Sequence, residues 1–374
     1  MEKSRLAVVN ALPTKTYRFL KVNEIGIGIP EQATDGGDPW NGMAPPTGVT
    51  FSRVERQEEL PDEIRAIETG MGASIDRALS DHGIPANILT VAAGAAIEEP
   101  VVMPVAVSCG SATMTSLVIR AEAGSSLTLI LDMTGSDAGC AAARSFFGLS
   151  TRIRAESGAH IRLVHLERFG ASITNFDDIG GWCEEGAQIE LTTLLLGSRN
   201  AVKGSEGSFL GARVTLSGDT SRFVNRTGYY FGGQTSLDMN IVADQRGRET
   251  VSDMIFRGVL ADHASKTWRG TIDFKSGSAG SVGDEQEDTL MLSPHVRNSS
   301  VPVILCAEED VDGRHGATIG QLSEDMLFYM SSRGIAVEEA RRMIVQARLK
   351  SIAREIPDSR LRWEIEQWIE KEIA

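Results

Sequence analysis

The segment Ala155-Glu156-Ser157-Gly158-Ala159 decides the fold, because close variants of it recur along the chain. The other copies read Ala92-Ala93-Gly94-Ala95, Ala121-Glu122-Ala123-Gly124-Ser125 and Cys183-Glu184-Glu185-Gly186-Ala187. Their glycines lie 30, 34 and 28 residues apart, at positions 94, 124, 158 and 186. Regular spacing of this length indicates a repeat architecture, in which one structural unit stacks on the next.

An alternating strand pattern follows three of these four copies, over residues 127–131, 161–166 and 189–194. Alternation of apolar and polar side chains predicts strands with one buried and one wet face. Parallel strands need a long connection, and here the connection carries more strand pattern instead of a helix. The pattern therefore predicts the stacked coils of a parallel β-helix. A β-sandwich or a double cupin barrel, which also uses short strands and glycine turns, stays open as the alternative.

Three regions follow from these patterns, and the predicted fold class is mainly β. Residues 91–319 form a right-handed parallel β-helix core, with less regular strands at 213–216, 237–242 and 267–274. Residues 1–90 form an N-terminal mixed segment, with an extended loop through Pro46 and then one helix that starts at Pro61 and stops near Gly83. Residues 320–374 form a C-terminal helical subdomain.

The C-terminal subdomain carries three apolar stripes at helical spacing. They consist of Leu322, Met326, Tyr329 and Met330, then Ala340, Met343, Ile344 and Ala347, then Leu361, Ile365, Trp368, Ile369 and Ile373. Such stripes usually pack on a core. Trp363 lies about 140° around its helix from Trp368 at 100° per residue, so the two cannot face the same core. A second surface for a partner is therefore expected there.

Composition excludes several functions. The 374 residues include 37 basic and 51 acidic side chains, for a net charge of −14, which argues against nucleic-acid binding. We expect no membrane span and no signal peptide, because no apolar run is long enough. The four cysteines are far apart, without a C-x-x-C pair, so neither a zinc site nor a disulfide framework is indicated. A cytoplasmic location fits best.

Catalytic motifs are missing from the sequence. It lacks the phosphate-binding G-x-x-x-x-G-K-[ST] loop, the H-E-x-x-H zinc motif and the G-x-S-x-G nucleophile elbow. The chain is accordingly expected to be non-catalytic and not to hydrolyse ATP by itself.

The stretch from 286 to 349 is the most informative for function. It contains three motifs. The first is Leu290-Met291-Leu292-Ser293. The second begins with the acidic residues Glu308 and Glu309 and continues as Asp310-Val311-Asp312-Gly313-Arg314-His315-Gly316-Ala317-Thr318-Ile319-Gly320, and the third is Leu327-Phe328-Tyr329-Met330-Ser331-Ser332-Arg333-Gly334-Ile335. Together with the upstream Thr267-Trp268-Arg269-Gly270-Thr271-Ile272, this stretch resembles the C-terminal signature of the SufB/SufD family, the scaffold subunits of the SUF iron–sulfur cluster assembly machinery. SufD-type members fit better, because the loop at 294–299 has no cysteine.

The resemblance implies a fold, partners and one candidate ligand. It implies a β-helix with a helical C-terminal subdomain. A SufC-type ATPase would dock on the C-terminal helices, where Met326, Tyr329 and Trp363 are the candidate contacts. A SufB-type paralogue or a second copy would pair through the β-helix. No cofactor is expected in the isolated chain, a transient iron or iron–sulfur cluster is expected in the complex, and flavin binding stays open.

His315 is the candidate iron or cluster ligand that the resemblance implies. The family cysteine two positions before it is Gly313 here, so a partner would have to supply the thiolate. The acidic residues Glu308, Glu309, Asp310 and Asp312 could attract a cation or form a solvated turn. Without the resemblance, a histidine after such a run is more often a loop or core residue.

Two other functional classes are compatible with a β-rich chain. A β-helix carbohydrate-active enzyme needs clustered acidic or basic residues on adjacent coils. A cupin-like metalloprotein needs two histidines and a carboxylate, but His160 and His165 are five residues apart and point to opposite faces of one strand. His165 is expected to face solvent, and Cys306 to be a buried small hydrophobe in its apolar strand.

Overall fold

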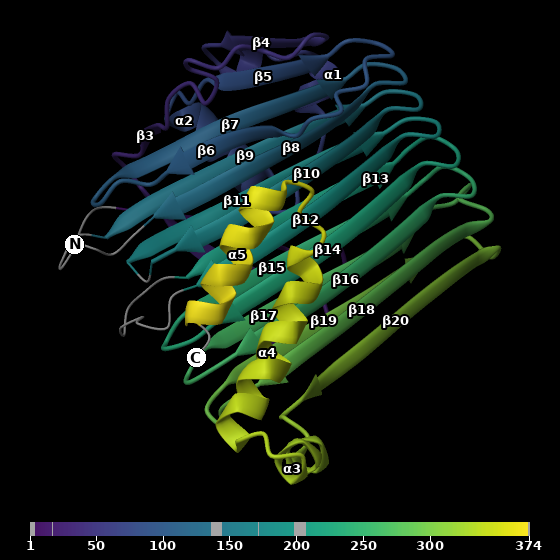
Figure 1. Cartoon of the computed structure of the whole chain (residues 1–374). Coiled ribbons are helices and arrows are strands. Elements are labelled where there is room, and N and C mark those ends of the chain that lie inside the picture. The colour runs from purple at the N-terminus through teal and green to yellow at the C-terminus, as the bar shows by residue number, and fades with distance from the viewer. Residues whose placement is uncertain (1–3, 17, 136–143, 171, 198–206, 373–374) are drawn as a thin grey trace.

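Two parallel β-sheets face each other and form one elongated solenoid of about seven coils (Figure 1). The computed structural model describes residues 4–16, 18–135, 144–170, 172–197 and 207–372. Strands alternate between the two sheets along the chain, so each coil contributes one strand to each sheet. This arrangement confirms the predicted parallel β-helix core and is neither a sandwich nor a cupin barrel.

From Ala112 onward the strands of both sheets have nearly uniform lengths of 9 to 11 residues, whereas the earlier strands that begin at Val49, Ala86 and Val101 have 6 residues each. The eight-stranded sheet runs, from one end of the solenoid to the other, through β6 (Val101–Ala106), β8 (Ser126–Gly135), β10 (His160–Phe169), β12 (Gln188–Gly197), β14 (Arg222–Phe231), β16 (Val251–Leu260), β18 (Ser281–Met291) and β20 (Val311–Gly320). The ten-stranded sheet runs through β4 (Val49–Val54), β5 (Ala86–Val91), β7 (Ala112–Ala121), β9 (Ser145–Ala155), β11 (Ile173–Cys183), β13 (Ser208–Leu216), β15 (Ser236–Gln245), β17 (Ser265–Phe274) and β19 (Arg297–Cys306), with β3 (Thr34–Asp35) beside β7.

The glycine turns that recur in the sequence stack on one another. Gly124, Gly158 and Gly186 have φ angles of 66°, 68° and 64°, in the left-handed region that glycine adopts without a steric cost. The N–H of Gly124 donates to the carbonyl of Ser157, and that of Gly158 donates to the carbonyl of Glu185, both in the next coil. The strands after these turns are in register, with Ile161 beside Leu127 and Ile189. The predicted equivalence of these turns is confirmed.

The space between the two sheets holds the main apolar core. Side chains of one parity along each strand point into it, such as Ile161 and Leu163 on β10 and Ile179 on β11. The other parity points outward, so Val164 and Leu166 belong to a separate cluster. Each fully buried leucine or isoleucine contributes about 1.5–3 kcal/mol. The solenoid is therefore stabilised coil by coil.

Two C-terminal helices cover the outer face of the eight-stranded sheet (Figure 1). These two helices are α4 (Val337–Ala353) and α5 (Ser359–Glu372). A third C-terminal helix, α3 (Glu324–Ser332), precedes them and does not lie on the sheet. Leu361, Ile365 and Ile369 of α5 are buried there, which confirms the predicted stripe for those residues. Trp368 is half-buried against the same cluster, and Ile373 lies outside the described residues.

Two of the predicted helical stripes are wrong in detail. On α3 only Leu327 is buried, whereas Met326 and Tyr329 are exposed. On α4 Ala340 is buried as predicted, but Met343 is exposed, because the residues that contact the sheet further along the helix lie on a different face from the predicted stripe. The reason is that α4 packs through its C-terminal half, with Val345, Leu349, Ile352 and Ala353 on the sheet.

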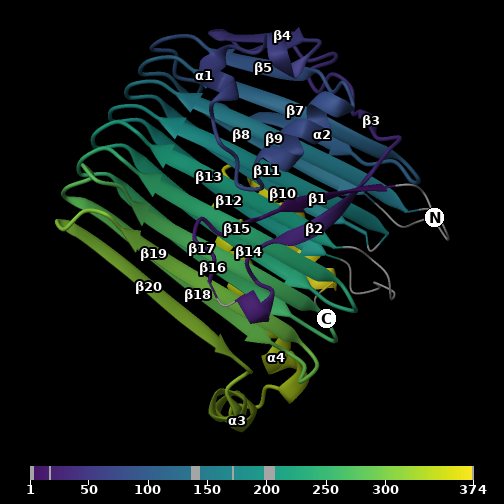
Figure 2. The ribbon, with the colours of Figure 1, turned by 180° about the vertical axis from the view of Figure 1, so that it is seen from behind.

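The N-terminal segment covers the outer face of the ten-stranded sheet (Figure 2). It contains the antiparallel pair β1 (Ser4–Val9) and β2 (Ile25–Pro30), the short 3-10 helices η1 (Arg18–Leu20) and η2 (Gln57–Glu59), and the helices α1 (Asp62–Arg65) and α2 (Ala73–Asp81). Strand β2 forms where an extended loop was predicted. Pairing with β1 satisfies its backbone, and Ile27 and Ile29 are buried.

The one helix predicted between Pro61 and Gly83 is in fact two. The link between α1 and α2 lies flat on the sheet, where the N–H of Gly70 donates to the carbonyl of Ile179 at 3.1 Å. The amide of Asn240 donates to the carbonyl of Gly70 at 2.9 Å. These tertiary hydrogen bonds replace the helical ones and end α1 early.

Gly70→Ala should destabilise the protein by about 1–3 kcal/mol, the usual cost of overpacking. A Cβ at Gly70 would overlap the backbone of Gly211 and Ala212 in β13, which cannot yield as a side-chain tip can. The midpoint of urea unfolding measures the loss. Gly320→Ala is the matched control, because a Cβ there meets nothing within 4 Å and should change stability by less than about 0.5 kcal/mol. Equal midpoints for the two variants would contradict the close packing.

Candidate functional site

The last coil leaves one end of the solenoid open. Strand β20 ends the eight-stranded sheet and β19 ends the ten-stranded sheet, so neither has a neighbouring strand on its outer side among the described residues. Neither strand contains a buried residue, and most of β20 is exposed. Figure 1 shows β20 as the outermost strand, at the lower edge of the solenoid. Ten-residue strands with a free edge are templates for pairing with another chain.

His315 lies in the middle of β20 on this open end. It is in register with Glu285 of β18, so its side chain projects from the face that lines the interior in the preceding coils. The imidazole is exposed and makes no hydrogen bond or ion pair with any residue that the structure describes. It borders a groove of about 530 Å³ together with Asp284, Glu287 and Arg314. Both ring nitrogens are therefore available to a ligand.

Gly313 lies where the family pattern has a cysteine. A Cβ at this position would lie 2.9 Å from the ring of Phe274 and 3.3 Å from Ile304. A larger side chain would need these neighbours to give way. Position 313 therefore offers no thiolate beside His315.

Cys306 was expected to be buried, and that expectation is wrong. Strand β19 is the last of its sheet, so no further coil covers it, and Cys306 is exposed. Its thiol donates to the carbonyl of Glu308 at 3.0 Å. Ile304 lies opposite Gly313, so Cys306 and His315 are separated by about four strand residues, or roughly 13 Å. That exceeds the reach of one metal ion with bonds of about 2.0–2.3 Å.

The acidic run before His315 forms a turn. The Glu308 carboxylate accepts hydrogen bonds from the N–H groups of Gly277 and Glu309, at 2.9 and 3.0 Å. The first of these bonds is the main reason that the pKa of Glu308 is lowered. Asp312 pairs with Arg314 on the same strand. Glu308 and Asp312 are therefore already partnered, and the geometry favours the turn over a cation path to His315.

Glu285 lies directly beneath His315 and is buried in the penultimate coil. Burial, and then the neighbouring carboxylates of Glu287 and Asp284, raise its pKa to about 8. One of its oxygens has no hydrogen-bond partner among the described residues. A pKa near 8 favours the protonated, uncharged form of Glu285 at neutral pH, so this carboxyl group beneath His315 carries little of the negative charge that the sequence suggests.

This raised pKa predicts lower stability at alkaline pH. The folded chain holds a proton on Glu285 that the unfolded chain releases near pH 4.5, so the stabilisation is complete below that pH and is lost as pH rises toward 8. Asp178, with a pKa raised by burial to about 7, acts in the same direction. From pH 5.5 to 8 the unfolding free energy should fall by on the order of 5 kcal/mol, of which Glu285 accounts for roughly 3 and Asp178 for roughly 2. Urea unfolding midpoints measured across this pH range give the pH dependence of stability, and Glu285→Gln should reduce it. An unchanged pH dependence in that variant would mean that groups other than Glu285 cause the loss of stability.

The candidate ATPase contacts occupy two separate places. Met326 and Tyr329 are 51% and 59% exposed on α3, next to Phe328 at 77%, a residue that the helical spacing did not single out. Trp363 is 62% exposed on the first turns of α5. Helix α4, about 25 Å long at 1.5 Å per residue, separates α3 from the start of α5 (Figure 1). The structure does not bring Trp363 together with Met326 and Tyr329.

The remaining two candidate histidines differ in burial. His160 lies at the surface, where its Nε2 is 2.9 Å from Glu190. His165 was expected to face solvent, which is wrong: it is 1% exposed and points between the sheets. Position 165 has the same parity as the interior residues Ile161 and Leu163, and both faces of this strand are covered. Alternation already places Glu167, two residues further along β10, on the same face, whereas the approach of Asp177 depends on how β11 folds back over β10.

No helix in the described part of the chain combines the length and apolar character needed to cross a membrane.

Comparison with known proteins points to one family. Residues 105–348, which make up more than half of the chain, match the family model described as "SUF system FeS cluster assembly, SufBD core domain". The chain is 26% identical over 195 residues to "Iron-sulfur cluster assembly protein SufD" of Bacillus subtilis, covering 48% of this chain and 44% of that protein. It is 23% identical over 202 residues to "Iron-sulfur cluster assembly protein SufB" of the same organism, covering 54% and 42%.

A third relative is an "Iron-sulfur cluster assembly SufBD family protein" of Mycobacterium leprae, 25% identical over 238 residues, with 62% of this chain and 27% of that protein covered. The match thus spans less than half the length of each of these three relatives. The matched core domain runs from β6 through most of α4 and includes the open end with His315. The chain belongs to the SufBD family of iron–sulfur cluster assembly proteins.

Proposed function

We propose that this chain is a non-catalytic, SufD-type scaffold subunit of a cytoplasmic SUF complex. It would act with a SufB-type paralogue, or a second copy of itself, and with a SufC-type ATPase. The observation that carries the proposal is the open end of the solenoid, where two long strands lack neighbours and His315 is exposed. The absence of a cysteine in the loop at 294–299 supports the SufD type.

Pairing at the open end follows from the physics of sheet edges. Natural proteins protect long edges with charges, proline or a covering element, because free N–H and C=O groups recruit other strands. Here Pro302 on β19 and Arg314 on β20 give partial protection, but both strands keep a full ten-residue length. A partner solenoid with its own open coil would extend both sheets at once, through main-chain hydrogen bonds.

His315 would then lie at the junction of the two subunits. Imidazole is a suitable ligand for iron, and this one is free of other partners among the described residues. A stable cluster normally needs about four ligands, mostly thiolates. Since Gly313 provides none and Cys306 lies about 13 Å away along the coil, the partner subunit would supply cysteine. The cluster is therefore expected to be transient and to need the complex.

His315→Ala should leave folding intact and reduce cluster assembly several-fold in the full complex. The side chain is exposed, so its removal should change stability by less than about 0.5 kcal/mol. Assembly is measured by the visible absorption of the reconstituted complex, and stability by urea unfolding. His160→Ala, at the surface of β10, is the matched control. If the complex that carries His315→Ala assembles the cluster at the wild-type rate, His315 is not a cluster ligand.

Hydrogen exchange tests the pairing itself. The chain is co-purified with the SufB-type subunit, and amide exchange is compared with that of the chain alone. Amides of β19 and β20 should slow in the complex, whereas those of β10, which lies between two strands, should not change. A complex that forms without slower exchange in β19 or β20 would show that the subunits meet elsewhere.

ATPase docking is proposed for the C-terminal helices, with α3 as the main contact. Its exposed Met326 and Tyr329, three residues apart and so on one face of the helix, form an apolar patch that no described residue buries, with Phe328 exposed on the flank beside Tyr329. Large apolar side chains are typical anchors of interfaces. The alternative functions lack such support. A carbohydrate-active enzyme or a cupin-like metalloprotein would not account for the family match.

A further inference from the structure

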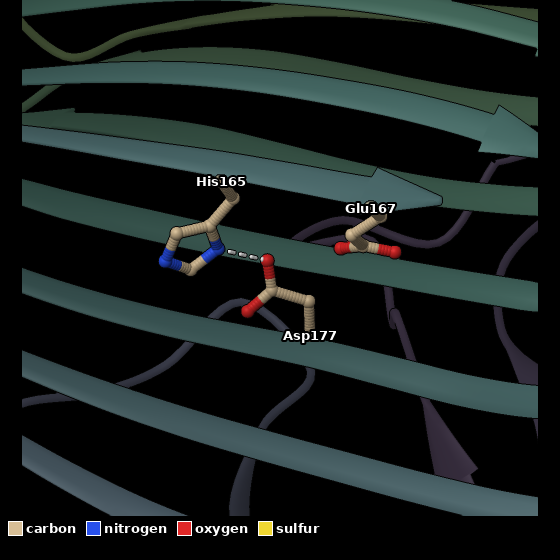
Figure 3. Close-up of side chains that lie close together, drawn as sticks. All are labelled: His165, Glu167 and Asp177. Atoms are coloured by element: carbon tan, nitrogen blue, oxygen red, sulfur yellow. Dashed lines mark hydrogen bonds and ion pairs between the residues drawn. The ribbon is translucent and has the colours of Figure 1, made fainter. Parts of the chain in front are cut away.

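Three ligand-type side chains meet inside the solenoid, far from the open end in the fold. His165 and Glu167 project from β10, and Asp177 projects from the next strand, β11 (Figure 3). One potential ligand atom of each lies within 4.8 Å of the others. His165 Nδ1 is hydrogen-bonded to Asp177 Oδ2. The three therefore converge on one point between the two sheets.

This point is sealed from water. His165, Glu167 and Asp177 are each at most 2% exposed. In the coil before, Leu131 and Met133 are in register with His165 and Glu167. An unpaired charge in such surroundings is costly, because nothing replaces its hydration.

The cluster lacks a compensating positive charge. Within the part of the chain that the structure describes, neither Glu167 nor Asp177 pairs with a lysine or arginine. Among the described residues, three buried polar atoms of the cluster have no hydrogen-bond partner: Nε2 of His165, Oε1 of Glu167 and Oδ1 of Asp177. Burial, and then the Asp177 carboxylate, raise the pKa of Glu167 well above its usual range. Two carboxylates and an imidazole are thus assembled without the cation that would stabilise them.

A second set of polar groups orients Glu167. The amide of Asn175 donates to Glu167 Oε2 at 2.7 Å, and the hydroxyl of Ser208 donates to Asn175 Oδ1 at 2.7 Å. These bonds hold one oxygen of Glu167 and leave the other free. Outer hydrogen bonds of this kind are what position the ligands in metal sites.

We propose that His165, Glu167 and Asp177 bind one divalent transition-metal ion inside the solenoid, separate from His315. One imidazole and two carboxylates suit Zn²⁺, Fe²⁺ or Mn²⁺. Bonds of about 2.0–2.2 Å place tetrahedral ligand atoms roughly 3.5 Å apart. The hydrogen-bonded pair His165 and Asp177 would therefore open to admit the ion, and Glu167 would move towards it. The ion would take the place of the proton between His165 and Asp177 and would neutralise the second carboxylate.

Loading is expected during folding. The ligands come from consecutive strands, between residues 165 and 177, so they meet as soon as one coil forms. Once the neighbouring coils stack on it, the site is closed on both sides. The bound ion should therefore resist brief exposure to a chelator, unlike an ion on the surface.

Refolding with metal tests the site. The untagged full-length chain is unfolded in guanidinium with EDTA, transferred to metal-free denaturant and refolded with Zn²⁺, Mn²⁺ or anaerobic Fe²⁺. Loose ions are removed with a chelating resin, and bound metal is counted by mass spectrometry. The variants are Glu167→Gln and Asp177→Asn. Asp178→Asn is the matched control, because Asp178 is the next residue of β11, equally buried, but on the opposite face under Met71.

The expected result is about one equivalent of one of these metals in the wild type and in Asp178→Asn. Glu167→Gln and Asp177→Asn should retain less than a tenth of that amount. A double variant, Cys306→Ser with His315→Ala, should keep the metal. A metal-free wild type under all three conditions, or metal that is lost only in the double variant, would overturn the proposal and leave a protonated buried network.

X-ray absorption of the metal-loaded wild type decides the matter if the carboxylate variants do not fold. Nitrogen and oxygen ligands alone at about 2.0–2.2 Å, with one imidazole, would support the site. Sulfur among the ligands would place the ion at a cysteine and refute it.

Discussion

Lys266→Met should destabilise the protein by about 3–5 kcal/mol, the usual cost of leaving one buried charge without its partner. Lys266 on β17 and Glu287 on β18 are both fully buried and form an ion pair between the sheets. The ammonium also donates to Tyr229 and Thr289, at 3.3 Å each. Removing it leaves the Glu287 carboxylate buried without a cation among the described residues, with a hydrogen bond from the Thr289 hydroxyl. Urea unfolding at pH 7 measures the effect.

Two further variants separate charge from packing. Lys266→Met combined with Glu287→Met should recover at least half of the loss, because replacing a whole buried pair by apolar groups is often neutral. Lys275→Met is the surface control: Lys275 pairs with Asp273 but is 41% exposed, so the change should be below about 1 kcal/mol. A double variant as unstable as Lys266→Met alone would mean that the shape of lysine, not its charge, is what matters.

Met326→Asp with Tyr329→Asp should weaken binding of the SufC-type ATPase by about 30- to 1,000-fold, which corresponds to about 2–4 kcal/mol. Both side chains are exposed on α3, so the chain itself should remain folded. Docking would require them to enter an apolar pocket, and a carboxylate there would be desolvated without a partner. Titration of the purified ATPase by calorimetry measures the affinity.

Removing the C-terminal helices would be a poor test of the same idea. Truncation after Gly320 would uncover Leu194, Tyr230 and Val259 on the outer face of the sheet, so lost binding could reflect aggregation. Leu20→Asp, at an exposed apolar residue of the N-terminal segment, is a better control and should bind normally. Trp363→Ala reports on the other end of the helical layer. If it alone weakens binding while the α3 variant does not, the ATPase docks beside α5 instead.

The fold was predictable because the solenoid is built from a local signal. Gly124, Gly158 and Gly186 need a left-handed turn, and a period-two strand follows each of them. Neither feature depends on distant contacts. The break between α1 and α2 was not predictable, since it follows from hydrogen bonds of Gly70 to β11 and β15, more than 100 residues away.

Which polar side chains are buried was harder to predict than the arrangement of the strands. The alternation in β10 correctly separates His160 from His165, but it does not reveal that both faces of this strand are covered. The outer face is hidden by α4 and α5, which arrive nearly 200 residues later. Likewise Cys306 lies in an apolar strand, and only its place at the end of the sheet leaves it exposed. Burial in a solenoid depends on the position of a coil in the stack as much as on its sequence.

Because the coils stack in register, the number of coils sets the length of the solenoid. Within the two sheets each coil contacts only the coils beside it, so one could be gained or lost if the helices and the N-terminal segment that span several coils shift with it. Such a change would move the His315 end by about 4.8 Å relative to the N-terminal cap, which is the spacing between adjacent strands. The distance between the two ends can therefore change in steps of one coil, while the sequence and structure of the end surfaces proposed to contact other subunits stay the same.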